Sequence, residues 1–178
     1  MSSGRRISAI VEAGVSPAFQ SSSQRARLPL QKDKITIRDA ESNDAPELAV
    51  LMRELGYETK RTEMETRLSL ILSNPAYKTF VAVMDGCVCG MIGTLAYPSH
   101  EHDDPSGRIL ALVTSRTVRR RGIGRTLIET AETDFAQRGI RRVSLDTRLT
   151  REDAHKFYEL LGYERNGWRF VKQLPLSN

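Results

Sequence analysis

The pattern of apolar and polar residues divides the chain at about residue 34. Residues 1–33 are rich in Ser, Arg and Gln and show no sustained apolar period, so we predict a flexible tail there. An organelle transit peptide is an alternative interpretation, because the stretch is poor in acidic residues. Residues 34–178 show the apolar periods of strands and helices and predict a single folded domain.

The folded part predicts an alternation of strands and helices. Residues 35–38 alternate as a strand does. A helix capped by Asn43 or Asp44 ends at Gly56, and a second helix covers residues 62–73, with Met64, Leu68, Ile71 and Leu72 directed inward. Further strands are predicted at residues 79–84, 87–95, 109–113, 140–147, 163–165 and 168–173.

Turn and cap signals refine this pattern. Asp85-Gly86 and Asn166-Gly167 each stand between strand-like runs and predict tight hairpins. Thr150, with an acidic residue three positions later, predicts the capping box of a helix that ends at Gly162.

One basic loop carries the strongest chemical signal. The sequence Arg-Arg-Arg-Gly-Ile-Gly at residues 119–124 follows the apolar run 109–113, and apolar residues then recur at helical spacing as far as Phe135, with Gly139 closing the run. N–H groups at a helix start lack intrahelical partners and the dipole there is positive. Glycines let the backbone approach a ligand, and arginines add charge, so the loop predicts an anion-binding site.

The spacing of this loop excludes two common phosphate-binding motifs. It lacks the third glycine of a Rossmann fingerprint and the Gly-Lys-Ser/Thr of a P-loop. Read on spacing alone, it could also be an ordinary helix start with surface arginines. However, it resembles the acetyl-CoA signature Gln/Arg-x-x-Gly-x-Gly/Ala of the GNAT superfamily of N-acetyltransferases.

A second stretch strengthens the resemblance. Residues 153–163, Asp-Ala-His-Lys-Phe-Tyr-Glu-Leu-Leu-Gly-Tyr, are similar to the family's helix Ala-x-x-x-Tyr-x-x-x-Gly-Phe/Tyr. The two motifs have the family's order and separation, and the resemblance covers roughly residues 35–174. It implies one α/β (α+β) domain with a mixed, mostly antiparallel sheet of six to seven strands and helices on both faces.

The resemblance also implies acetyl-CoA as acetyl donor, with direct transfer to an amine, and a set of cofactor-binding residues. The loop would hold the pyrophosphate, and the backbone of the preceding strand near Val113 would pair with the pantetheine arm. The implied residues are Val113, Thr114, Arg119, Arg120, Arg121, Gly122, Ile123, Gly124, Arg125 and Thr126.

Tyr158 is the catalytic candidate that the resemblance implies. A phenol with a pKa of about 10 can protonate a departing thiolate. The alternative is a core aromatic residue beside Phe157 on an amphipathic helix.

The general base is not evident from the sequence. Many family members carry Glu early in the strand before the loop, where this chain has Leu110. Either a chain of waters removes the amine proton, or a residue of the loop 100–104 does, with Glu101 and His102 as candidates. A solvated polar loop is the alternative interpretation, and we predict no metal site.

Composition restricts the partners. The net charge of +5 lies mostly in residues 1–34, with six basic and two acidic residues, whereas the rest has 21 basic and 20 acidic residues. A nearly neutral domain does not favour nucleic-acid binding. The sequence contains no run of about 18 apolar residues, the length that a membrane-spanning helix needs. Cys87 and Cys89 fit small apolar strand residues in a reducing, cytoplasmic compartment.

The predicted acceptor is a primary amine on a small molecule. Residues 150–174 are also similar to small-amine acetyltransferases, including those that act on aminoalkylphosphonates. Acetylation of a protein lysine or N-terminus remains an alternative, as does a non-catalytic acyl-CoA sensor. A homodimer is compatible with the predicted fold.

Overall fold

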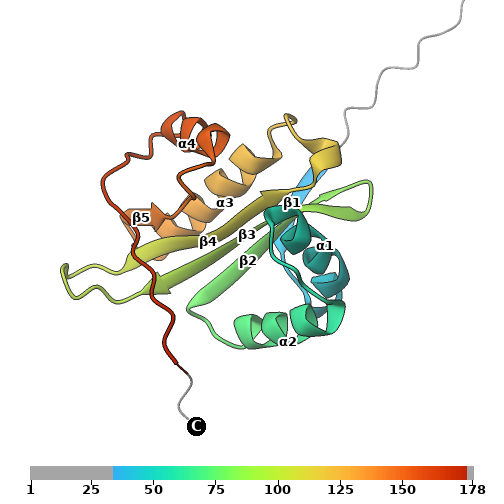
Figure 1. Ribbon diagram of the computed structural model, residues 1–178, viewed down its shortest axis with the longest axis horizontal. Coiled ribbons are helices and arrows are strands. Elements are labelled where there is room, and N and C mark those ends of the chain that lie inside the picture. The colour runs from blue at the N-terminus through green and yellow to red at the C-terminus, as the bar shows by residue number, and fades with distance from the viewer. Residues whose placement is uncertain (1–33, 176–178) are drawn as a thin grey trace, which may run out of the picture. The chain divides into compact units, whose positions relative to one another are not determined.

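The computed structural model describes residues 34–175 (Figure 1). The tail predicted for residues 1–33 and the last three residues lie outside the described residues, so the predicted domain boundary stays a prediction. No helix within residues 34–175 has the length and apolar character needed to cross a membrane.

Five strands form one sheet in the order β1-β2-β3-β4-β5. Neighbouring strands are antiparallel from β1 to β4, and β5 runs parallel to β4. The strands are β1 Ile35–Asp39, β2 Tyr77–Met84, β3 Cys87–Tyr97, β4 Ser106–Thr114 and β5 Arg142–Leu145. The predicted class, a mixed and mostly antiparallel sheet in an α/β (α+β) domain, is confirmed. The predicted count of six to seven strands is wrong for the described part of the chain.

Helices cover both faces of the sheet (Figure 1). The helices α1 and α2 pack on one face and α3 packs on the other. Successive strand residues point to opposite faces, so each strand contributes to both apolar clusters. Phe80 of β2, for example, joins the α3 cluster, whereas its neighbour Val81 joins the cluster of α1 and α2. The helices are α1 Ala45–Leu55, α2 Arg61–Leu72, α3 Ile123–Gln137 and α4 Glu152–Glu159.

Two local signals act as the sequence predicts. Asp85 and Gly86 both have positive φ, 51° and 80°, which gives the twist that a two-residue hairpin between β2 and β3 requires. Gly139 has φ 74°, and after it the Ile140 N–H donates to the Phe135 carbonyl at 2.9 Å, which ends α3. Both turns place the following strand in register with the sheet.

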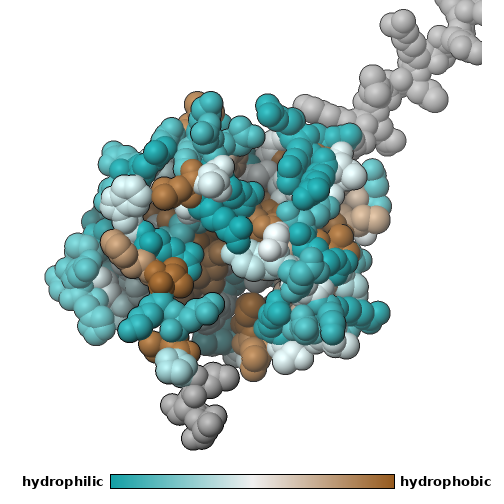
Figure 2. Space-filling model, viewed as in Figure 1, coloured by the Kyte–Doolittle hydropathy of each residue, from teal (hydrophilic) through white to brown (hydrophobic). Residues whose placement is uncertain are grey.

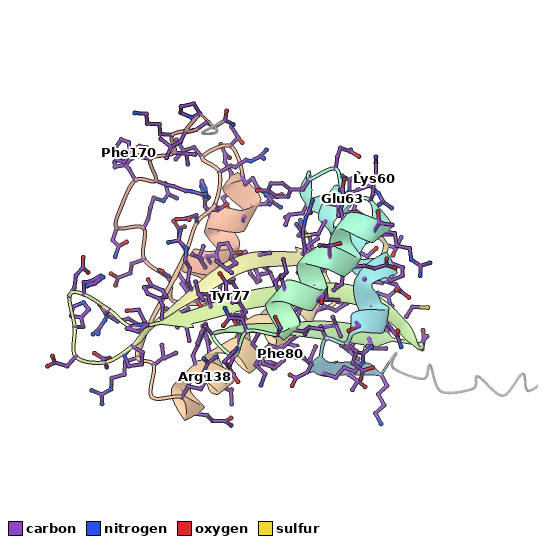
Figure 3. The ribbon with its side chains drawn as sticks, turned by 90° about the horizontal axis from the view of Figure 1, so that it is seen from below. Lys60, Glu63, Tyr77, Phe80, Arg138 and Phe170 are labelled. Carbon is purple, nitrogen blue, oxygen red and sulfur yellow. The ribbon has the colours of Figure 1, made fainter. Side chains whose placement is uncertain are left out.

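Several predicted details are wrong. Residues 163–175 contain no strand: Tyr163 packs on the core, but the large apolar side chains from Trp168 to Leu174 are exposed, and Arg169 pairs with Asp146 at 3.5 Å. Phe170 is 92% exposed and lies away from the sheet (Figure 3). Thr150 does not cap α4: the N-cap is the next residue, Arg151, which makes no side-chain cap hydrogen bond, and the helix begins at Glu152. On α2, Leu72 is 42% exposed rather than directed inward.

We predict that Gly107→Ala destabilises the fold. A Cβ at Gly107 on β4 would lie 2.9 Å from the Phe135 ring and 3.1 Å from Ile140. Overpacking of this kind costs about 1–3 kcal/mol of unfolding free energy, measurable by urea denaturation. The matched control is Gly93→Ala, where an added Cβ meets no atom within 4 Å. Equal stability of the two variants would contradict the packing described for β4 and α3.

Candidate active site

Strand β4 has an open edge next to the basic loop. Its parallel pairing with β5 ends at Ile109, opposite Leu145, although β4 continues to Thr114. Within the described residues, no strand pairs with this edge from Leu110 onward. The N–H and C=O groups of the edge can therefore pair with an extended ligand.

A β-bulge at Leu110 creates this separation. The partner of Gly93 is Ala111 and the partner of Thr94 is Ile109, so Leu110 has no partner on β3. A bulge bends its strand and increases the local twist, which directs the end of β4 away from β5. The Leu110 side chain is 49% exposed and lacks the carboxylate that the resemblance would place there.

The loop after β4 has the backbone of an anion-binding site. A short 3-10 turn, Arg116–Val118, leads to Arg120 with φ 65° and Gly122 with φ 82°, and α3 begins at Ile123. A Cβ at Gly122 would meet no atom within 4 Å, so the backbone there is open to a ligand. The unpaired N–H groups of the first turn of a helix, together with its dipole, favour an anion at this point.

Side chains around this helix start supply positive charge. Arg119, Arg120 and Arg121 are exposed in the loop, and Arg125 stands on the first turn with Glu129 at 3.9 Å. Val113 and Ile123, also predicted cofactor residues, are buried, so they can contribute only backbone groups. An anion site next to an open strand edge fits a ligand that combines a diphosphate with an extended amide-containing arm, as CoA does.

Tyr158 lies close to the start of α3. A Cβ at Gly124 would be 3.5 Å from the ring of Phe157, which places α4 beside the first turn of α3. The Tyr158 ring centroid is 5.2 Å from that of Phe157 and 5.9 Å from that of Tyr163. Burial raises the pKa of the Tyr158 hydroxyl, and the positive charge of Arg151 acts in the opposite direction. Among residues 34–175 this hydroxyl makes no hydrogen bond, unlike that of Tyr163, which donates to Glu132 at 2.8 Å.

A narrow, mostly apolar cavity of ≈ 130 Å³ adjoins the bulge. It lies between the sheet and the helices α1 and α2. Leu110 and Ala111 of β4 form one side of it, and Arg67 of α2 is a charged residue at its wall. The other lining residues are Met52, Met64, Ile71, Tyr77, Lys78, Thr79, Met91, Gly93 and Thr94. The cavity thus lies beside the open edge of β4.

The structure does not bring Glu101 and His102 to this site. Both are exposed in the connection between β3 and β4, which lies at the opposite end of β4 from the basic loop. Nine strand residues separate the two ends, or roughly 26 Å at the usual rise. In the same connection, Asp104 pairs with Arg142 of β5, which lowers the pKa of the Asp104 carboxyl.

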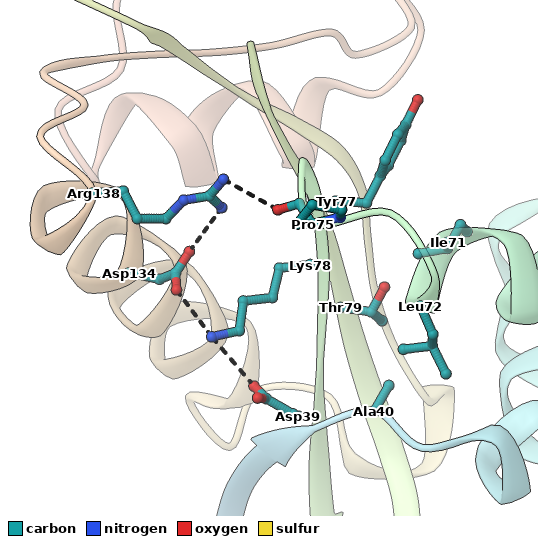
Figure 4. A pocket seen from close by; sticks show the side chains of 10 residues that line it. All are labelled: Asp39, Ala40, Ile71, Leu72, Pro75, Tyr77, Lys78, Thr79, Asp134 and Arg138. Carbon is teal, nitrogen blue, oxygen red and sulfur yellow. Dashed lines mark hydrogen bonds and ion pairs between the residues drawn. The ribbon is translucent and has the colours of Figure 1, made fainter.

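A larger cavity of ≈ 370 Å³ adjoins the one beside the bulge, because Ile71, Tyr77, Lys78 and Thr79 line both (Figure 4). Lys78 reaches Asp134 at 3.0 Å and Asp39 at 3.7 Å, and Arg138 reaches Asp134 at 3.5 Å and the Pro75 carbonyl at 3.4 Å. Each of these charges faces one of opposite sign. The arrangement ties the end of α3 to β1 and β2, and we assign it no ligand.

Two residues near the site were not identified from the sequence. Glu54 on α1 contacts the start of the basic loop, and Arg67 on α2 lines the cavity beside the bulge. Both stand on helices among other charged residues. No local pattern separates them from solvated neighbours, and only the packing of α1 and α2 on the sheet places them here.

Comparisons with known proteins agree with this geometry. The acetyltransferase (GNAT) family pattern matches residues 43–163. An aminoalkylphosphonate N-acetyltransferase from Salmonella typhimurium is 32% identical over 139 residues, which cover 78% of this chain and 88% of the relative. An uncharacterized N-acetyltransferase from Bacillus subtilis is 27% identical and covers 78% of this chain and 95% of its own length.

Solved structures show the same fold. A putative acetyltransferase from Agrobacterium tumefaciens has a TM-score of 0.72 at 26% identity, over 78% of this chain and 99% of its own. An aminoglycoside N-acetyltransferase in complex with CoA has a TM-score of 0.74 at 18% identity, over 84% of this chain and 100% of its own.

The family match spans well over half of the chain and includes both sequence motifs. The resemblance inferred from the basic loop and the Tyr158 helix is thereby confirmed. The chain belongs to the GNAT family of acetyltransferases and is an N-acetyltransferase whose acetyl donor is acetyl-CoA.

Proposed function

We propose that the acceptor is a primary amine on a small molecule, and that aminoalkylphosphonates are the first class to test. The observation that carries this proposal is the narrow cavity of ≈ 130 Å³ next to Leu110, between the open edge of β4 and the helices α1 and α2. The 32% identical relative named as an aminoalkylphosphonate N-acetyltransferase supports the choice of class. Arg67 at the cavity wall already pairs with Glu63 at 3.5 Å, and its guanidinium has further N–H donors that can attract an acidic group on the acceptor.

The donor is held by two parts of the chain in this proposal. Arg119, Arg120, Arg121 and the first N–H groups of α3 bind the diphosphate. Backbone groups of β4 from Leu110 to Thr114 pair with the extended arm. When bound, acetyl-CoA supplies the acetyl thioester. The buried side chains of Val113 and Ile123 keep this backbone rigid, which holds the donor in one orientation.

Tyr158 supplies the proton that the departing sulfur requires. Its pKa is raised by burial above the ordinary value of 10.0, so the hydroxyl stays protonated at pH 7–9 and can donate. Its freedom from hydrogen bonds to residues 34–175 leaves that proton available. Arg151 stabilises the phenolate that remains, because its positive charge lowers the cost of ionisation.

No carboxylate or histidine lines the cavity, so we propose that water removes the amine proton. Leu110 occupies the position of the usual Glu, and the cavity walls within the described residues offer only apolar, hydroxyl and cationic side chains. The acceptor's own amine pKa then governs the rise of rate with pH. Glu101 and His102, at the other end of β4, have no part in this account.

We predict that Tyr158→Phe lowers kcat by about 100-fold, the usual contribution of a general acid, and leaves the affinity for CoA nearly unchanged. Steady-state kinetics and calorimetric titration measure the two quantities. Tyr163→Phe is the matched control from the same aromatic group, because its hydroxyl is engaged with Glu132. It should lower stability and retain kcat. A Tyr158→Phe enzyme with full kcat would show that another group provides the proton.

Thiol release from acetyl-CoA across a panel of acceptors tests the proposed substrate class. The panel contains aminoalkylphosphonates, simple alkylamines, polyamines, aminoglycosides and lysine peptides, each at pH 7 and pH 9. We expect the highest kcat/KM with small amines, and a larger gain at pH 9 for the acceptor with the more basic amine. Activity confined to lysine peptides would refute the small-molecule proposal and favour a protein acceptor.

A further inference from the structure

The carboxylate of Glu54 connects helix α1 to the first turn of the basic loop. The Arg116 N–H donates to Glu54 Oε2 at 2.7 Å, and the Ser115 hydroxyl donates to Glu54 Oε1 at 3.3 Å. Glu54 lies 62 and 61 positions away from these residues in the chain. Both oxygens of a single half-buried side chain therefore hold the point where β4 ends and the loop starts.

This contact has the geometry of a helix cap supplied by a distant residue. Ser115 precedes the 3-10 turn Arg116–Val118, and its own side chain makes no cap hydrogen bond. The Glu54 carboxylate satisfies the first N–H of that turn instead, as a capping side chain does. On its other side, the Ser115 N–H donates to the Cys89 carbonyl at 2.8 Å, and its hydroxyl lies 3.1 Å from that of Thr117. The turn is thus fixed between α1 and β3.

The turn determines where the arginines stand. Only Arg119, Arg120 and Arg121 separate Val118 from Gly122, the residue before α3. Val118 is buried, and its N–H donates to the Ser115 carbonyl at 3.1 Å. Arg120, a residue with a side chain, adopts φ 65°, a conformation that surrounding structure must impose. Loss of the anchor at Ser115 and Arg116 would release this strained segment.

We propose that Glu54 is a positioning residue for the donor: by capping the turn Arg116–Val118 it fixes the diphosphate-binding loop in the binding conformation before acetyl-CoA arrives. The proposal rests on the proposed function only in placing the donor diphosphate at this loop. A carboxylate this close to an anion site would by itself repel phosphate. Its contribution to binding must therefore come from its hydrogen bonds, and this distinguishes positioning from simple charge.

The test is calorimetric titration of the full-length protein with CoA. We expect Glu54→Ala to raise the Kd for CoA about ten-fold, since the loop must be ordered during binding once the two hydrogen bonds are lost. Glu54→Gln keeps an oxygen that accepts from the Arg116 N–H, so its Kd should rise by no more than about threefold. In both variants kcat at saturating acetyl-CoA should be retained, while the KM for acetyl-CoA follows the Kd. Amide exchange at Arg116 should be faster in Glu54→Ala.

Glu47→Gln is the matched control, because this exposed residue is on the same helix and the change removes the same charge. It should leave the CoA affinity unaltered.

If Glu54→Ala does not fold, Glu54→Asp replaces it: the shorter side chain keeps the charge, withdraws both oxygens, and should weaken CoA binding. CoA binding at the original affinity, or tighter binding in both Glu54→Ala and Glu54→Gln, would overturn the proposal. If the Kd for CoA changes in these variants as predicted but the enzyme acetylates no amine, the result would refute the proposed acceptor alone.

Discussion

The site depends on a single constraint: strand β4 is hydrogen-bonded to β3 along its length but to β5 only as far as Ile109. The bulge at Leu110 bends the strand at that point, and beyond it one edge of β4 is free of any strand within the described residues. An unpaired edge inside a protein is normally a liability that is covered or blunted. Here it ends in a loop of three arginines and a helix start, so the same feature becomes a place where a long, anionic ligand can bind.

The packing on either side keeps this edge in place. Apolar clusters on both faces bury the middle strands, and Gly107 admits the ring of Phe135 close to β4. Helix α4 lies against the start of α3 through Phe157, which carries Tyr158 toward the same end of the sheet. Glu54 then ties α1 to the start of the loop. Elements from both faces of the sheet thereby meet at the end of β4, and the face of the molecule seen in Figure 2 carries mostly polar residues.

Features encoded by short stretches could be predicted from the sequence. Asp85-Gly86 specifies its hairpin because two adjacent residues with positive φ are needed there, and Gly139 ends α3 for a similar reason. The basic loop and the Tyr158 helix were recognisable because their residue types are fixed by the chemistry they serve. The class of fold and the location of the loop between β4 and α3 followed from these signals.

Features that depend on distant packing could not be predicted. The alternation at Trp168–Phe170 is typical of a strand, yet the segment pairs with no strand of the sheet, and Trp168 is 76% exposed. Glu101 and His102 have suitable side chains, but the antiparallel pairing of β3 and β4 puts their loop at the wrong end. Glu54 has nothing distinctive around it in the sequence, because its partners are some 60 positions away.

The most direct test of the central claim is amide hydrogen exchange of the full-length protein with and without CoA. The account predicts new protection of the β4 edge from Leu110 to Thr114 and of the first turn of α3 from Ile123 to Thr126, with no change in β1. Protection confined to other segments, or none at β4 despite saturating CoA, would contradict the assignment of the donor to this edge and loop.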